Sequence, residues 1–415
     1  MKVGLSQNPN PPVDFVVDGV KNMEESGFDS VWFPDHLMGW FPQSLWTEEN
    51  SSIVTLLPSP HLYMDPTILM GLAGQATSSI QLATGVTEAI RRQPAELART
   101  FLTLSLSTKG RAILGIGAGE RENTEPYGLS YSKQASRLEE AIHIIRLLWE
   151  SKSPVDFDGR FWKLRKAVMA LDPHGGEFPP IYVAAHGPKM LDITGRYADG
   201  WIPAYPMPPS EYREKLELVR KAANEAGRDP NAITPAYWLY AVVAEDHDAA
   251  HRILASPLAG ALALVAGSAE WERGGKKHPL GAGFQGLRDY VPEWYSKDEL
   301  QAALAHYDPE LFHDQIVHGT PEEVVSQIAP YADAGLEHVV FANIAPVAGL
   351  EYYDFAQDGL RRVAQSLKSL TLGVTSSTSR LIRSSIVPPM ADTHMCCAPA
   401  SANSRKRVAT SSADP

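Results

Sequence analysis

Residues 112–128 read AILGIGAGERENTEPYG, an apolar run broken by glycines at 115, 117 and 119. The run has the length and composition of a buried strand, although glycine weakens strands. Its spacing matches the G-x-G-x-x-G turn of dinucleotide-binding sheets only superficially. The sixth position is Glu120, and residues 121–128 predict a loop instead of a helix. The stretch therefore argues against an open dinucleotide-binding sheet.

The three glycines would share one face of this strand, because side chains alternate along it. Two explanations stay open. Glycine is typical of a bulge or a bend in a barrel, and it also permits a flat ligand or a phosphate to approach the backbone. In the second case the Glu120 carboxylate would stand at the rim of the ligand site.

Eight apolar runs alternate with amphipathic segments over the first 370 residues. The predicted strands are 2–5, 30–33, 80–86, 111–117, 180–186, 200–204, 237–244 and 337–344. Clear helical patterns cover 94–107, 136–151, 209–227 and 322–335. Repeated strand–helix alternation favours an α/β fold in the form of a single (β/α)8 TIM barrel over a doubly wound sheet.

Three segments are longer than barrel loops require: 35–65, 152–178 and 245–310, inserted after strands two, four and seven. The second reads as a small hairpin. Loops that follow barrel strands lie at the catalytic end, so the first and third are expected to roof a pocket, with ornamental insertion as the alternative. Residues 371–415 are rich in Ser, Thr, Ala and Pro and lack periodicity, which predicts a disordered tail after a barrel domain of residues 1–370.

Composition excludes several classes of protein. A net charge of −12 argues against nucleic-acid binding, and no apolar stretch is long enough for an integral membrane segment. The chain begins without a signal peptide, which predicts a cytoplasmic protein. The two cysteines, Cys396 and Cys397, lie in the tail, and clustered metal-ligand motifs are lacking, so no metal site is expected.

Several candidate site residues follow the predicted strands. Asp35 and His36 come after the second strand, and Arg91 and Arg92 come after the third. Histidine carries protons near neutral pH, although a structural role for this Asp-His pair is equally open. The arginines could bind an anion or lie in solvent. Gly187 precedes a proline at the start of a helix, which is typical of anion sites but also of ordinary turns.

Four motifs taken together resemble the luciferase-like family of β/α barrels, and within it the branch that uses the deazaflavin coenzyme F420. They are DHLMGW (35–40), TGV (84–86), GIGAGERENTEPYG (115–128) and YVAAHGPKML (182–191), in the order that the family has them. The resemblance runs from about residue 2 to 370. It implies that a cofactor ring lies across the strand ends, and that the Gly85–Val86 peptide bond is cis.

The resemblance also implies roles for individual residues. His36, Trp40 and Glu120 would surround the reactive face of the cofactor, with His36 as acid and proton relay and Glu120 supporting the ring. The residues that would line the cofactor are Asp35, Gly85, Val86, Gly117, Gly119, Asn123, Ala184, Ala185 and Gly187. His186 stands where relatives have a small residue.

The resulting hypothesis is an F420-dependent reductase that passes hydride to the ketone of a large apolar, lipid-like substrate. The uncharged loop 204–210 argues against a sugar phosphate as the substrate. Aromatic side chains of the first and third insertions and that loop are predicted to line the substrate mouth, or else to pack on the barrel or to form a subunit interface. They are Trp40, Phe41, Trp46, Tyr205, Trp271, Phe284, Tyr290, Trp294 and Tyr295, together with Met207. The alternatives are an FMN-dependent monooxygenase and a catalytically silent flavin-binding protein. The resemblance further implies a homodimer.

Overall fold

Each apolar run predicted as a strand forms one in the computed structural model, which describes residues 1–312 and 315–384. The barrel strands are β1 (Lys2–Ser6), β2 (Ser30–Phe33), β3 (Gln81–Thr84), β5 (Ala112–Gly117), β8 (Ile181–Val183), β9 (Gly200–Trp201), β10 (Thr234–Val243) and β12 (His338–Asn343). They pair in the order β12-β1-β2-β3-β5-β8-β9-β10. Strand β10 also pairs with β12, from Ala236↔His338 to Ala241↔Asn343, so the sheet closes into a barrel of eight parallel strands.

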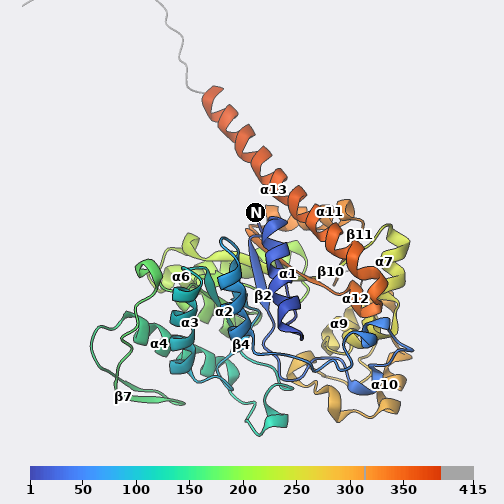
Figure 1. Ribbon diagram of the computed structural model, residues 1–415, viewed down its shortest axis with the longest axis horizontal. Helices are drawn as coiled ribbons and strands as arrows, with labels where there is room; N and C mark the ends of the chain where they lie inside the picture. Colours follow the sequence, from blue (N-terminus) through green and yellow to red (C-terminus); the bar gives the residue numbers. More distant parts are fainter. Residues whose placement is uncertain (313–314, 385–415) are drawn as a thin grey trace, which may run out of the picture. The chain divides into compact units, whose positions relative to one another are not determined.

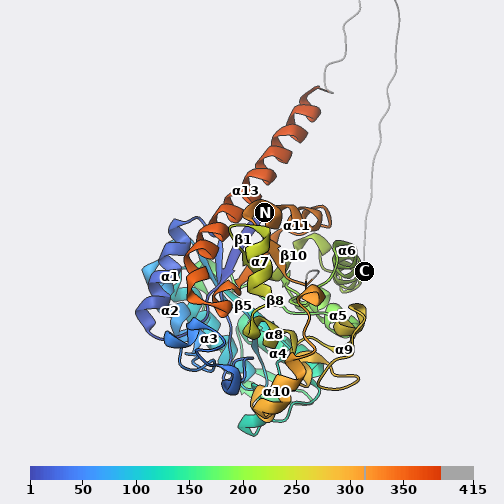
Figure 2. The ribbon, with the colours of Figure 1, turned by 90° about the vertical axis from the view of Figure 1, so that its right-hand side faces the viewer.

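A helix follows each barrel strand and packs on the outside (Figure 1). These helices are α1 (Val13–Glu25), α2 (Pro66–Ala76), α3 (Pro94–Ser107), α4 (Gln134–Glu150), α5 (Pro188–Tyr197), α6 (Pro209–Glu225), α11 (Pro321–Asp333) and α13 (Tyr353–Ser384). Figure 2 shows β1, β5, β8 and β10 between α1–α3 on one side and α5 and α6 on the other. The predicted (β/α)8 fold is confirmed.

Strand side chains that point inward fill the barrel, as in other barrels of this size. The buried interior cluster comprises Trp32, Ala83, Ile113, Tyr182, Ile202, Ala236, Trp238, Val340 and Ala342. Gly115 belongs to this layer. A Cβ atom there would lie 1.9 Å from the Thr84 carbonyl oxygen, and the Thr84 hydroxyl donates to the Gly115 carbonyl at 2.7 Å. The close approach of β3 therefore explains this glycine, without any ligand.

A polar network lies inside the barrel, next to the apolar layer. The Trp32 indole donates to Ser30 Oγ at 2.9 Å, and Ser30 Oγ lies 2.8 Å from His338 Nε2. His338 is fully buried. Since Ser30 Oγ accepts from Trp32, its own hydrogen is available for His338 Nε2. Burial is the main reason why that imidazole stays neutral, because it lowers the pKa of His338.

Stability should fall as the pH drops below 6.5, because burial lowers the pKa of three histidines. The pKa values are about 3 for His186 and His338, and about 4 for His278. Between pH 6.5 and 5 the unfolded chain binds protons at these positions and the folded chain does not. Each group then lowers the unfolding free energy by about 1.4 kcal/mol per pH unit. Urea unfolding at pH 7, 6 and 5 measures this slope, and His338→Gln should reduce it by about one proton; a flat profile would contradict the assignment.

The insertions add short elements to the barrel. Residues 35–65 contain the 3-10 turns η1 (Gln43–Leu45) and η2 (Ser52–Thr55), and β6 (Val155–Asp158) with β7 (Lys163–Ala167) forms the predicted hairpin. The third insertion contains α7 (His247–Leu254), α8 (Pro257–Ala263), α9 (Ser268–Arg273) and α10 (Lys297–Leu304). Outside the insertions, the elements that were not predicted include β4 (Thr87–Glu88), β11 (Val317–Gly319), which pairs with β10, and α12 (Ala345–Ala348).

The first and third insertions pack on each other and form a second hydrophobic core, at the lower right of Figure 1. Trp46, Trp271, Phe284 and Tyr290 are all buried in it. The expectation that these four side chains line a substrate mouth is therefore wrong. Burial of a large aromatic side chain contributes more to stability than burial of a small one, and in this core the aromatic side chains of each insertion are buried against the other insertion. Met207 is likewise buried, in the main core.

The last helix is longer than expected. Helix α13 continues to Ser384, whereas disorder was predicted from residue 371. Extending an existing helix needs no new nucleus, and the first proline after Leu370 is Pro388. The rest of the predicted tail, 385–415, lies outside the described residues. No helix of the described part of the chain is long and apolar enough to cross a membrane.

Candidate active site

Two loops bring the predicted imidazole and carboxylate together at the carboxyl ends of the strands. His36 follows β2, and Glu120 follows β5. His36 Nδ1 lies 3.5 Å from Glu120 Oε2, and the two side chains are 11% and 28% exposed. This end of a parallel barrel is where barrel enzymes carry their chemistry. The two residues thus form a partly enclosed pair at that end.

Asn123, predicted to contact a cofactor, organises this pair. Its Oδ1 accepts from the backbone N–H of Leu37 at 2.7 Å and of Met38 at 3.3 Å, which fixes the orientation of the amide. Its Nδ2 consequently faces His36 Nδ1 at 2.9 Å and Glu122 Oε1 at 3.1 Å. One amide thereby ties the loop after β2 to the loop after β5.

The hydrogen bond from Asn123 decides where the proton of His36 lies. Because Asn123 Nδ2 donates to Nδ1, we assign the single ring hydrogen of neutral His36 to Nε2. Burial lowers the pKa of His36, although the charge of Glu120 acts in the opposite direction. A proton relay through His36, as predicted, would therefore have to use Nε2, because Nδ1 accepts from Asn123. His36 offers one hydrogen-bond donor, Nε2–H.

Glu122 is an acidic residue of the site that sequence reasoning missed. Its side chain is fully buried, whereas Glu120 is partly exposed. The Trp40 indole lies between the two carboxylates, 3.4 Å from Glu120 Oε2 and 3.3 Å from Glu122 Oε1. Burial, followed by the charge of Glu120, raises the pKa of Glu122 well above its usual value. The site therefore contains a carboxyl pair with one buried member.

His36, Glu120 and Glu122 also have the spacing of a cation site, because their candidate ligand atoms all lie within 4.8 Å of one another. Two of these atoms, His36 Nδ1 and Glu122 Oε1, already accept hydrogen bonds from Asn123. A cation bound to these atoms would have to break both hydrogen bonds from Asn123. The expectation that the protein holds no metal stays a prediction.

Tyrosines form the wall around this cluster. Burial is the main cause of a raised pKa in each, and the charge of Glu120 contributes to all of them: Tyr63, Tyr131, Tyr205 and Tyr240. The His36 ring packs edge-on against Trp40 and Tyr63, each at 5.3 Å between centroids. The mouth is thus aromatic, but only Trp40 and Tyr205 among these side chains were predicted to line it.

Asp35 holds two arginines instead of standing free. It accepts from Arg92 Nε at 2.7 Å and from the Thr87 hydroxyl at 2.6 Å, and Arg91 Nη2 lies 3.4 Å away. The pKa of Asp35 is lowered by Arg92 and Arg91, which outweigh the effect of its burial. Arg91 also pairs with Glu88, and Arg92 with Asp65. The arginines therefore bind anions of the chain itself, and the predicted contact of Asp35 with a cofactor stays a prediction.

The predicted cofactor residues of three strand ends converge. A Cβ atom at Gly117 would lie 2.9 Å from Val86 Cγ2 and 3.5 Å from Ala184 Cβ. Gly119 has a φ of 86°, a conformation that side chains rarely adopt. The peptide bond Gly85–Val86 is cis, as the resemblance implied. Backbone and small side chains therefore border this part of the mouth, which fits the close approach of a flat ring.

In the segment after β8, the position of Gly187 is compatible with the predicted contact with a cofactor, whereas that of Ala185 is not. Gly187 is exposed, precedes α5 and has open space where a side chain would be. Ala185 is fully buried in the main core, so its methyl group does not line the mouth. His186 Nε2 accepts from the backbone N–H groups of Ala204 and Tyr205, at 2.9 and 3.1 Å. His186 thus joins the ends of β8 and β9, which explains a large residue at this position.

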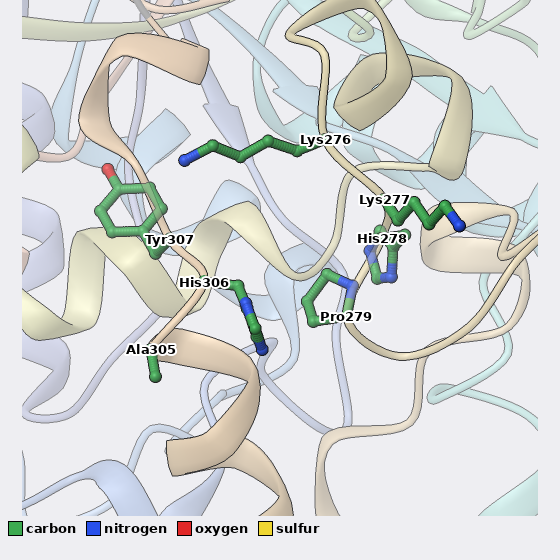
Figure 3. A pocket seen from close by; sticks show the side chains of 7 residues that line it. All are labelled: Lys276, Lys277, His278, Pro279, Ala305, His306 and Tyr307. Atoms are coloured by element: carbon green, nitrogen blue, oxygen red, sulfur yellow. The ribbon is translucent and has the colours of Figure 1, made fainter.

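A separate pocket of about 450 Å³ lies in the third insertion (Figure 3). It is lined by Lys276, Lys277, His278, Pro279, Ala305, His306 and Tyr307. In Figure 3 the Lys276 side chain runs toward Tyr307, and Lys277 points away from it. Lys276 is paired with Asp308 at 2.7 Å. None of the lining residues belongs to the His36 cluster.

Comparison with known proteins agrees with this geometry. A family model described as luciferase-like monooxygenase matches residues 2–338. The chain belongs to this family. The luciferase-like chain is accordingly an oxidoreductase, and the predicted resemblance is confirmed.

Two curated relatives are informative. The phthiodiolone/phenolphthiodiolone dimycocerosates ketoreductase of Mycobacterium sp. (strain JLS) is 40% identical over 346 residues, which cover 82% of this chain and 88% of the relative. The F420-dependent hydroxymycolic acid dehydrogenase of Mycobacterium tuberculosis is 36% identical over 242 residues, 57% of this chain and 61% of the relative.

A solved structure supports the fold of this luciferase-like chain. It is an F420-dependent secondary alcohol dehydrogenase in complex with an F420–acetone adduct, with a TM-score of 0.67 and 24% sequence identity. The match covers 88% of this chain and 97% of that one.

Proposed function

We propose that this protein is a coenzyme F420-dependent ketoreductase that acts on a large apolar, lipid-like ketone of the phthiodiolone type. The observation that carries the proposal is the His36–Asn123–Glu120 arrangement beside the glycine-bordered strand ends. It supports the proposal because one neutral N–H donor and one carboxyl pair lie next to strand ends bordered by backbone and small side chains, where the ring of a flat cofactor would be held. The named activities of the two mycobacterial relatives support the cofactor and the reaction.

Reduced F420, when bound, would supply the hydride that a ketone carbon takes up. The residues that would hold it are the backbone and small side chains at Gly85, Val86, Gly117, Gly119 and Ala184. Gly187, at the amino end of α5, would face an anionic part of the coenzyme. Asp35 would act indirectly: its ion pairs with Arg91 and Arg92 would fix the loop that carries His36.

The chain's own contribution centres on His36. Its Nε2–H would donate to the ketone oxygen and stabilise the negative charge that develops there, as a preorganised donor does in an oxyanion hole. The enclosing rings of Trp40, Tyr63 and Tyr240 keep water away and strengthen that hydrogen bond. His36 stays neutral because its pKa is lowered by burial.

The charges of the site favour an uncharged substrate. A phosphate ester needs free cations, but Arg91 and Arg92 are both paired with carboxylates of the chain. The loop 204–210 carries no charge. In a mouth walled by tyrosine rings, each additional buried CH2 group of a substrate would contribute about 0.8 kcal/mol.

Cofactor titration tests the proposal most directly. We expect purified protein to quench F420 fluorescence at micromolar concentration and to leave FMN fluorescence unchanged. Gly117→Val should abolish the F420 response because it fills the space between Val86 and Ala184. Gly71→Ala provides the control, because Gly71 lies in the helix α2 and its Cβ atom would meet only Leu104 Cδ2, at 3.9 Å. Tight FMN binding without F420 binding would favour a monooxygenase, and binding of neither would refute the cofactor assignment.

Substrate class is tested with a series of ketones of rising chain length and reduced F420. We expect kcat/KM to rise with chain length, while glucose 6-phosphate run in the oxidative direction gives no turnover. Efficient oxidation of the sugar phosphate without a chain-length trend would overturn the lipid-ketone assignment.

A further inference from the structure

Glu122 is the most deeply buried acidic side chain of the mouth. It follows β5 by five residues, in a loop, yet its side chain has no exposed surface. Oε1 accepts from Asn123 Nδ2 at 3.1 Å and faces the Trp40 indole at 3.3 Å. Oε2 is buried and has no hydrogen-bond donor among the described residues. An ionised carboxylate with one orphaned oxygen in such a place is costly.

The neighbouring Glu120 raises the free-energy cost of having both carboxyl groups ionised at the same time. Its Oε2 approaches the same Trp40 indole, at 3.4 Å, and the same Asn123 amide, at 3.5 Å. One oxygen of each carboxyl group lies within 4.8 Å of the other, and two carboxylates this close repel each other, so one of them keeps a proton. Protonation of Glu122 removes the negative charge beside its orphaned oxygen, and a hydrogen bond with Glu120 favours that protonated form.

We propose that Glu122 shares one proton with Glu120 and acts through it. The pair supplies the proton that the product oxygen takes up, and Glu120 delivers it. This inference rests on the proposed ketoreductase function. His36 cannot supply that proton alone, because Nδ1 accepts from Asn123 and loss of the Nε2 hydrogen would leave an imidazolate.

The step is balanced in atoms and charge. The ketone carbon gains a hydride and its two electrons from the reduced cofactor, and its oxygen becomes an alkoxide that His36 Nε2–H holds. The O–H bond of Glu122 breaks as Glu120 takes the proton. Glu120, which is partly exposed to the mouth, then passes that proton to the alkoxide and forms the alcohol. The pair goes from one negative charge to two and regains a proton from solvent through Glu120.

The groups facing the pair leave no competing acid near neutral pH. His36 has a lowered pKa, and the tyrosines Tyr63, Tyr131 and Tyr205 have raised pKa values, to which Glu122 or Glu120 contributes. Arg91 acts on His36 through its charge but is paired with Glu88. The Glu120–Glu122 pair is therefore the group of this cluster that can change protonation during turnover.

Infrared difference spectroscopy on the protein without cofactor tests the shared proton directly. We expect a protonated-carboxyl C=O band at pH 7 that disappears in Glu122→Gln. In Glu120→Gln the band should persist at a shifted frequency, because burial, the largest cause of the raised pKa of Glu122, is unchanged. Glutamine at 122 keeps the volume and the acceptor for Asn123, so the fold should persist, and an unchanged Tm confirms it. Glu125→Gln, which alters a partly exposed partner of Arg121, is the matched control and should keep the band. A band that persists in Glu122→Gln overturns the proposal.

The pH profile tests delivery of the proton. With reduced F420 and a long-chain ketone, wild-type kcat should fall on the alkaline side as the pair loses its proton. Glu122→Gln should lower kcat by about 10²-fold at pH 7, within the range of general acid catalysis, and shift the alkaline limb to lower pH. KM and F420 affinity should change less than threefold. A normal profile in Glu122→Gln would refute the acid role even if the band is lost.

The two measurements separate this inference from the proposed function. If no variant and no wild-type protein turns over with F420, the ketoreductase assignment and the delivery step both fail, while the infrared band still decides whether the pair shares a proton. A band that appears only after chelator treatment would show that a cation occupied the pair, and would overturn the shared proton.

Discussion

His36→Ala should lower kcat for ketone reduction by about 10²–10³-fold, the usual loss when one preorganised donor to a developing oxyanion is removed. The affinity for F420 should change little, because the cofactor-facing surface assigned above is backbone and small side chains. Stopped-flow reduction under saturating F420 measures the first quantity, and fluorescence quenching measures the second.

His36→Gln is the matched variant for this test. Its side-chain amide can still donate a hydrogen bond into the mouth, so it should recover part of the activity that alanine loses. Full activity in both variants would show that the ketone oxygen is held elsewhere. Loss of F420 binding in both, with kcat preserved at saturation, would instead give His36 a purely cofactor-positioning role.

Asp35→Asn should lower the unfolding free energy by about 3–5 kcal/mol, the cost of leaving a buried ion pair without its partner. Asp35 is 2% exposed, and it faces Arg91 and Arg92, which are 10% and 23% exposed. An amide in its place removes the buried carboxylate that both guanidinium groups share, and leaves Arg91 with Glu88 and Arg92 with Asp65 only. Urea unfolding at pH 7 without cofactor measures the change.

Asp65→Asn tests the second ion pair of Arg92, the one with Asp65. Asp65 pairs with Arg92 at 2.9 Å but is 37% exposed, and its Oδ1 also caps α2 by accepting from Thr67. Asparagine preserves the cap, so the loss should stay near or below 1 kcal/mol. Equal losses in the two variants would mean that burial of Asp35 does not govern the strength of this ion pair.

The strands and helices of the barrel were predictable because they depend on short-range patterns. The apolar run 111–117 forms β5 within one residue, and the pattern 94–107 forms α3 over the predicted range. Strand β11 has only three residues, too few for any periodicity. Helix α13 passes the predicted end because Ser and Thr at its carboxyl end weaken a helix without stopping it.

The candidate site was predictable in its parts and not in its connections. Glycine and loop signals placed Gly117 at the end of a strand and Gly119 and Glu120 directly after it, and a resemblance supplied the expected roles. Glu122 was missed because burial cannot be read from a loop sequence, where acidic residues are usually solvated. The only available signal was a second carboxylate two positions from Glu120. The position of the aromatic residues in the insertions was unpredictable for the same reason, because a hydrophobic core and an apolar substrate mouth are built from the same kinds of side chain.

Sequence alone therefore determined the order of strands and helices, and hence which loops gather at the carboxyl end of the barrel. The tertiary structure alone decided which side chains meet there. Asn123 bonds to His36 across 87 positions of the chain, and Trp40 reaches Glu122 across 82. Such contacts leave no local pattern, because they depend on barrel closure. The protonation of His36, the burial of Glu122 and the pairing of Asp35 with Arg92 are set by those contacts, since burial and neighbouring charges control which ionised forms a folded protein can hold.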